Sequence, residues 1–177
     1  HINQIGYIYR GVSIRKNTNW TDPSEACEIN INCSPVGDNW QDEKQGVVRI
    51  FVTTPGGQGW CTGSLVNNTN QNCTPYFLTA WHCYENATAS QLNQWVFYFN
   101  YEASGCTTPT NEPSSNTMTG ASLKAAADIT GGSDLLLLQL NQTIPINYNP
   151  YMNGWNRANS VTGPGVGIHH PASSIKK

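Results

Sequence analysis

Short apolar runs rich in Val, Ile, Leu, Tyr and Phe recur along this chain, and clusters of Gly, Pro and Asn separate them. Such runs between turn-forming residues indicate β-strands, and convincing helical periodicity is absent. Several short strands joined by tight turns predict an all-β fold, either a closed barrel or a sandwich. The predicted strands cover residues 4–9, 46–53, 59–67, 75–80, 94–101, 122–127, 135–140 and 165–169.

The segments between the predicted strands differ in composition. Residues 105–120 are dense in Thr, Pro, Asn and Ser, which predicts a long surface loop. Residues 81–85 directly follow a predicted strand, and we expect one short helical turn there. Residues 145–159 are rich in Asn and Pro, which is typical of a linker between barrels rather than of a core.

Composition narrows the classes of protein to which the chain can belong. The chain has 177 residues, a net charge of −2 and only 11% charged residues. It is not basic enough to favour a nucleic-acid partner. No apolar run reaches the roughly 20 residues of a membrane span, so no membrane partner is expected, and any export signal is expected to have been removed already.

The six cysteines indicate an oxidising compartment. They lie at positions 27, 33, 61, 73, 83 and 106 and form no Cys-x-x-Cys pair, so their spacing suits disulfides better than a zinc cluster. We therefore expect a secreted protein, either extracellular or periplasmic. Cys61 and Cys83 flank the two strands that precede residues 81–85, and a bridge between them would close a loop of about 22 residues.

A histidine and an aspartate carry the candidate chemistry. His82 follows an apolar strand directly, and Asp134 opens another apolar strand after two glycines. A serine nucleophile near neutral pH needs a neutral imidazole to accept its proton and a carboxylate to orient that imidazole. We predict that His82 is the general base and that Asp134 orients it. Asp128 is the competing carboxylate, but no apolar strand follows it.

Other residues of the types used in active sites have structural explanations. Ser64 follows a glycine but precedes the candidate base, and Ser133 lacks the glycine-flanked elbow that exposes a nucleophile, so both are interpreted as structural. His169 and His170 are adjacent, and adjacent strand residues point to opposite faces, which argues against one shared metal ion. We expect no metal and no organic cofactor.

Several blocks of sequence resemble a known family when taken together. They are Ala-Cys-Glu-Ile-Asn-Ile-Asn-Cys at 26–33, Cys-Thr-Gly-Ser-Leu-Val-Asn-Asn-Thr at 61–69, Phe-Leu-Thr-Ala-Trp-His-Cys at 77–83, Ser-Asp-Leu at 133–135, Gly-Trp at 154–155 and Ile-His-His-Pro at 168–171. Their order and spacing resemble those of bacterial lysyl endopeptidases, which belong to the chymotrypsin superfamily. The resemblance runs from about Cys27 to the last residue.

The resemblance implies a chymotrypsin-like double antiparallel β-barrel. Residues 1–26 would be an N-terminal extension or a retained pro-segment. Residues 27–143 would form the first barrel, and residues 144–177 the linker and the first strands of the second barrel. The family's remaining third, with the nucleophilic serine, the oxyanion hole and the acidic residue of the lysine pocket, would lie outside this sequence.

The resemblance also implies a cysteine pairing. Cys33 would pair with Cys106, and Cys27 would pair with a cysteine in the portion that the sequence lacks. Cys73 departs from the family pattern, and its partner stays open. The Cys61–Cys83 bridge is expected in addition to these pairs, and it would also hold His82, the residue next to Cys83.

Three functions remain open from the sequence. The first is a secreted serine endopeptidase that cleaves protein or peptide substrates after lysine, with a C-terminal chain of the same protease as partner. The second is the same reaction with another specificity, for example for glutamate. The third is a catalytically inactive binding protein on the protease fold, which Trp81, a bulky neighbour of His82, favours slightly. If the parent enzyme nicks itself after Lys177, residues 176–177 lie in an exposed loop; alternatively, the gene ends there.

Overall fold

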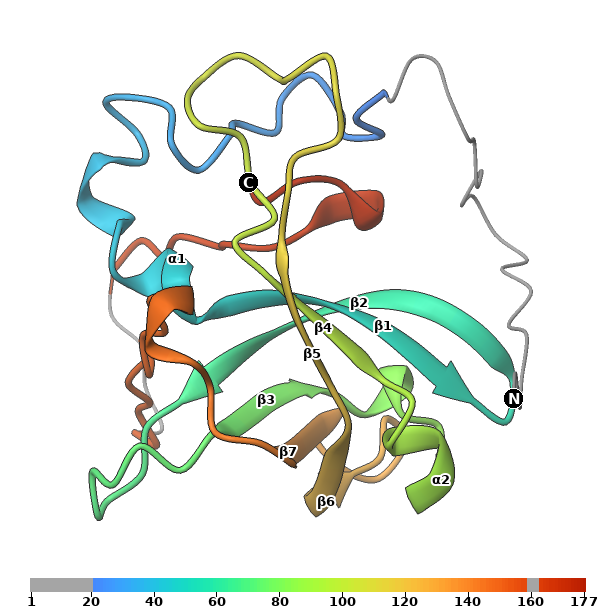
Figure 1. Ribbon diagram of the computed structural model, residues 1–177. Helices are drawn as coiled ribbons and strands as arrows, with labels where there is room; N and C mark the ends of the chain where they lie inside the picture. The colour runs from blue at the N-terminus through green and yellow to red at the C-terminus, as the bar shows by residue number, and fades with distance from the viewer. Residues whose placement is uncertain (1–20, 159–162) are drawn as a thin grey trace.

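Seven strands form one curled antiparallel sheet. The computed structural model describes residues 21–158 and 163–177. The sheet order is β5-β4-β1-β2-β3-β7-β6, and every pairing is antiparallel. The strands are β1 (Val47–Thr54), β2 (Gly57–Val66), β3 (Tyr76–Ala80), β4 (Val96–Phe99), β5 (Asn116–Thr119), β6 (Ala121–Ala127) and β7 (Leu135–Leu140). The sheet is strongly curled (Figure 1), and its strands enclose the main hydrophobic core. The all-β class is therefore confirmed, and the curl is that expected of a chymotrypsin-like barrel.

The helices are all short and lie between or beyond the strands. They are η1 (Asp38–Trp40), α1 (Glu43–Gly46), η2 (Trp81–Cys83), α2 (Ala89–Leu92), η3 (Ile146–Tyr148) and η4 (Pro171–Ser173). The short turn expected at residues 81–85 is η2, which begins directly after β3. Among the described residues, no helix is long and apolar enough to cross a membrane.

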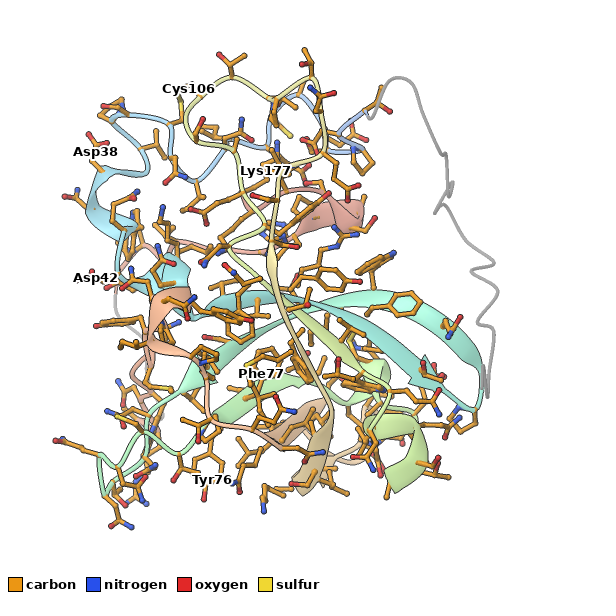
Figure 2. All side chains as sticks on the ribbon, in the orientation of Figure 1. Asp38, Asp42, Tyr76, Phe77, Cys106 and Lys177 are labelled. Carbon is orange, nitrogen blue, oxygen red and sulfur yellow. A yellow bond between two sulfur atoms is a disulfide. The ribbon has the colours of Figure 1, made fainter. Side chains whose placement is uncertain are left out.

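The core forms because alternate strand residues point into the curl. The fully buried side chains include Val48, Ile50, Leu65, Phe77, Trp95, Phe97, Leu136 and Leu138. Phe77 of β3 lies in the middle of this core (Figure 2). A Cβ at Gly63 of β2 would collide with the Phe77 ring and would lie 2.7 Å from the carbonyl oxygen of Leu78, so only glycine lets β2 and β3 pack this closely.

Most of the predicted strands are present with small shifts at their ends, but two predictions are wrong. Residues 165–169 form no strand: the backbone groups of His169 bond only to Lys177, and this single pairing does not extend into a ladder. The loop predicted at 105–120 contains β5, which pairs with β4 and buries Met118. The strand predicted at 4–9 lies outside the described residues.

An arginine on the outer face of the sheet is buried by aromatic rings. Arg49 of β1 points away from the main core, yet it is only 6% exposed. Its guanidinium carbon lies 3.6 Å from the centroid of the Trp60 ring and 4.3 Å from that of Tyr101. Cation–π attraction of this kind offsets part of the loss of water around the charge. The outer face of β1 and β2 is therefore also packed.

The last residues cover this outer face and are held by a buried charge cluster. The segment after residue 163 runs over β1 and β2 (Figure 1). Lys176 is fully buried, with Nζ 2.8 Å from the carbonyl oxygen of Lys44 and 3.0 Å from a carboxylate oxygen of Glu102. Lys44 pairs with the other oxygen of Glu102 at 2.7 Å. The single carboxylate of Glu102 thus forms ion pairs with two buried ammonium groups.

Lys177 is buried in the same way next to the N-terminal segment. Its Nζ donates to Asp22 and to Asn30, each at 2.8 Å. It lies near the loop that carries Cys106 (Figure 2). The expectation that residues 176–177 form an exposed loop is therefore wrong, because both ammonium groups find buried partners that are distant in sequence.

Candidate catalytic site

His82 is positioned by a strand on one side and by a disulfide on the other. It lies in η2, which begins where β3 ends, and β3 is held between β2 and β7. The next residue, Cys83, is bonded to Cys61 of β2. The short helix therefore cannot swing away from the sheet without breaking either the strand ladder or the disulfide.

Asp134 reaches His82 because of the register between β3 and β7. Ala80, the last residue of β3, pairs with Leu135, the first residue of β7. The next residues outward along the two antiparallel strands are Trp81 and Asp134, and the Trp81 N–H donates to the Asp134 carbonyl at 3.1 Å. A residue just before β7 must therefore lie beside the residue just after β3.

The carboxylate of Asp134 bonds to His82 at two points. Oδ2 lies 2.7 Å from Nδ1 of the imidazole, and Oδ1 accepts the His82 backbone N–H at 2.9 Å. The hydrogen bond from the His82 ring, followed by that from its backbone, lowers the pKa of Asp134. An ionised carboxylate only accepts hydrogen bonds, so Nδ1 carries the proton and Nε2 of the neutral ring keeps its lone pair.

This pair is open to solvent on the described surface. The His82 side chain is 58% exposed and that of Asp134 is 28% exposed. A histidine with a free Nε2 and a fixed Nδ1 can accept a proton from a group that approaches from outside and can return it afterwards. The arrangement suits a general base that acts on a group brought to it.

Asp128, the competing carboxylate, makes no hydrogen bond to His82 in the described structure. Its Oδ1 accepts the N–H of Thr130 at 3.0 Å and the N–H of Gly131 at 2.6 Å. The hydrogen bond from Gly131 is the largest cause that lowers the pKa of Asp128. The structure therefore brings Asp134, and not Asp128, to the imidazole. These hydrogen bonds of Asp128 within its own loop were not predicted from the sequence.

The cysteines divide into two bonded pairs and two free thiols. The disulfides are Cys33–Cys106 and Cys61–Cys83. Cys27 and Cys73 are free and exposed, and they do not bond to each other. The described residues contain one group of side chains close enough together to hold a metal ion, and it consists of His82 with Cys61 and Cys83. Their sulfurs are joined in the disulfide, so they are not thiolate ligands.

The remaining candidates lie in structural positions. Ser64 Oγ accepts a hydrogen bond from Asn153 at 2.7 Å, while Ser133 is exposed beside Asp134. His169 is exposed, whereas His170 is buried and its Nδ1 donates to the Ser174 carbonyl at 3.0 Å. Burial lowers the pKa of His170 well below its ordinary value.

Two comparisons place these features among known proteins. A family model described as the C-terminal domain of lysyl endopeptidase matches residues 21–177. The lysyl endopeptidase of Pseudomonas aeruginosa is 32% identical over 160 residues, which cover 87% of this chain and 34% of that protein. The chain thus spans about a third of the length of this curated relative.

Proposed function

The chain belongs to the lysyl endopeptidase family, and we propose that it forms the base-bearing portion of a secreted serine endopeptidase that cleaves peptide bonds after lysine. The observation that carries the proposal is the 2.7 Å contact between His82 Nδ1 and Asp134 Oδ2. The relative's name supports the choice of lysine as the residue before the cut. The two disulfides are compatible with an oxidising compartment outside the cytoplasm.

In the proposed reaction, His82 acts twice. Nε2 first removes the proton of a serine hydroxyl while the serine oxygen attacks the substrate carbonyl, and Nε2 then gives this proton to the leaving amine. An acyl-enzyme results. Water then attacks the acyl-enzyme: Nε2 takes a proton from the water and gives it to the serine oxygen as the acyl–oxygen bond breaks, which releases the acid and restores the serine. Asp134 stays ionised throughout, keeps the proton on Nδ1 and stabilises the imidazolium that forms between transfers.

The nucleophilic serine, its oxyanion hole and the lysine pocket are proposed to lie on a C-terminal portion of the same protease. The 58% exposure of the His82 side chain supports this arrangement, because an approaching second barrel would cover it. The exposed thiol of Cys27 supports it as well, since it could form a disulfide with that portion. Chymotrypsin-like catalysis needs all of these groups, so the 177 residues alone are expected to hydrolyse peptides at background rates.

One observation bears on the alternative of an inactive binding protein. Trp81, the residue that favoured this alternative, packs against the main hydrophobic core and is half-buried. Its ring therefore contributes to the barrel. No specific feature of the described residues favours a cut after glutamate, so lysine remains the proposed specificity.

The proposal is tested on the purified protease in two steps. A native mass spectrum before and after reduction first shows whether a serine-bearing chain accompanies the 19.4 kDa chain and whether a disulfide links them. Labelling with a fluorophosphonate then reports an activated serine, and matched lysyl, arginyl and glutamyl amides report specificity. Labelling together with preferential cleavage of the lysyl amide is expected. A serine-bearing protein that neither labels nor cleaves would be an inactive binding protein, and one that prefers the glutamyl amide would refute the lysyl assignment.

A further inference from the structure

Asp134 holds a backbone conformation that its surroundings must enforce. Its φ is +51°, in the left-handed region that non-glycine residues seldom occupy. Aspartate is among the residues that tolerate this region, at a cost of order 1 kcal/mol or more. The conformation lets one residue present both its carbonyl oxygen to Trp81 and its carboxylate to His82. Whatever fixes the backbone at Asp134 therefore also fixes the imidazole.

The connection that leads into Asp134 is organised by a single residue. The segment 128–134 joins β6 to β7, whose ends pair at Ala127 and Leu135. Asp128 Oδ1 accepts from the Thr130 N–H, from the Thr130 hydroxyl at 3.2 Å and from the Gly131 N–H. The side chain thus closes the first half of the loop on itself.

The carbonyl of the same residue reaches the second half of the loop. It accepts the Gly132 N–H at 3.1 Å and the Asp134 N–H at 3.3 Å. The hydrogen bond to the Asp134 N–H acts directly on the residue in the left-handed conformation. Asp128 therefore connects to Asp134 through one backbone hydrogen bond and through the turn that its side chain builds.

The loop leaves no room for a side chain at one of its glycines. A Cβ at Gly132 would lie 2.8 Å from both the Asp128 carbonyl oxygen and the Ala127 Cβ, which is closer than real Cβ atoms come. A Cβ at Gly131 would meet only Asp128 Oδ1, at an ordinary 3.6 Å. Substitution of Gly132 by alanine should therefore disturb the loop, whereas the same substitution at the adjacent Gly131 should not.

We propose that Asp128 is a positioning residue of the active site, which sets the backbone of Asp134 through the 128–134 loop and thereby the orientation of the His82 imidazole. The role rests on the proposed function, since orientation of His82 matters to the rate only if His82 is the general base. Asp128 makes no hydrogen bond to the imidazole in the described structure, and in this role it acts only through Asp134.

The test follows the Nδ1–H proton of His82 by NMR in protein with isotope-labelled histidine, with His82→Ala to assign the signal. Asp128→Ala removes the acceptor of three hydrogen bonds, whereas Asp128→Asn keeps an acceptor oxygen. Gly132→Ala disturbs the loop independently of any change in charge, and Gly131→Ala is its matched control. Asp42→Ala removes the same charge at an exposed residue whose side chain caps no helix.

The hydrogen-bonded Nδ1–H signal is expected to disappear by exchange with water in Asp128→Ala and Gly132→Ala and to persist in the other three variants. In the serine-bearing protease, kcat for a lysyl amide should fall about 10- to 100-fold in the first two variants with KM unchanged, as small misplacements of catalytic groups do. Asp128→Asn should restore both readouts.

The proposal is overturned if Asp128→Ala and Gly132→Ala keep the Nδ1–H signal of the wild type, whatever happens to kcat. It is also overturned if Gly131→Ala or Asp42→Ala loses the signal to the same extent. The NMR comparison needs no turnover, so it decides the role of Asp128 even if the wild-type protease proves inactive and the proposed function fails.

Discussion

The carboxylate of Asp134 and His82 meet at two points, one on the imidazole and one on the backbone, at 2.7 and 2.9 Å. The double contact fixes both the protonated nitrogen and the position of the residue. An Asn at 134 could keep the left-handed backbone, because Asn also tolerates that region. It would place a neutral amide beside Nδ1 and would no longer stabilise the imidazolium.

We therefore predict that Asp134→Asn preserves folding and lowers kcat of the serine-bearing protease about 10⁴-fold, with the imidazole in the wrong tautomer. Steady-state hydrolysis of a lysyl amide measures the loss, and Asp42→Asn serves as the control for an Asp-to-Asn change at an exposed position. A drop of less than tenfold would mean that Asp134 is not the orienting carboxylate.

The two disulfides should have opposite rankings in stability and in activity. In the chain-entropy estimate, the 73-residue separation of Cys33–Cys106 contributes about 4 kcal/mol and the 22-residue separation of Cys61–Cys83 about 3 kcal/mol. Only Cys61–Cys83 adjoins His82. Each bridge is removed by a double Cys→Ala substitution, and the two variants are compared by urea unfolding and by kcat. Loss of Cys33–Cys106 should lower the free energy of unfolding more, whereas loss of Cys61–Cys83 should lower kcat more. The reverse ranking for kcat would contradict the role of η2 in holding His82.

Removal of the Glu102 carboxylate should destabilise the fold strongly. Lys44 and Lys176 both bond to it, and Lys176 is fully buried. Glu102→Gln leaves two buried ammonium groups without a counter-charge, which costs about 3 to 5 kcal/mol when one partner of a buried ion pair is lost. The free energy of unfolding in urea measures the effect, with the exposed Glu25→Gln as control. A loss below 1 kcal/mol would show that water reaches the cluster.

The same carboxylate predicts the direction of a pH effect. Burial alone raises the pKa of Glu102, but the charge on Lys176 and the hydrogen bonds from Lys44, Asn32 and Lys176 outweigh burial, so the pKa is lowered from 4.5. A group with a depressed folded-state pKa stabilises the protein in full above its ordinary value, and this contribution is lost as pH falls through the folded-state pKa.

The difference in unfolding free energy between the wild type and Glu102→Gln should therefore stay constant above pH 4.5 and shrink in more acidic solution. Urea titrations across the acidic range check this expectation. A difference that grows on acidification would mean that the folded-state pKa of Glu102 is raised.

The sheet was largely predictable from the sequence because its signal is local. Strands β1, β2, β3 and β7 bury alternate or consecutive apolar residues, and this pattern can be recognised in the amino-acid sequence. β5 was missed because Met118 is its one buried residue among Asn and Thr. Residues 165–169 resembled a strand through Val166 and Ile168, but their backbone groups form no ladder with a described strand.

The two residues of the site were predictable from the sequence, but the contacts that hold them in place were not. Proximity of His82 and Asp134 depends on the pairing of Ala80 with Leu135, which sequence spacing alone does not reveal. Burial of Lys176 was not predictable either, because lysines are rarely buried without a partner, and Glu102 is 74 residues away. The part played by Asp128 depends on backbone hydrogen bonds, which leave no trace in residue types.

The proposed function depends above all on His82 acting as the general base. The most direct measurement compares kcat for a lysyl amide in the serine-bearing protease with that of His82→Ala, with the exposed His169→Ala as matched control. We expect kcat to fall about 10⁴-fold or more in His82→Ala and to change within about twofold in His169→Ala. Equal turnover by the wild type and His82→Ala would show that His82 is not the general base.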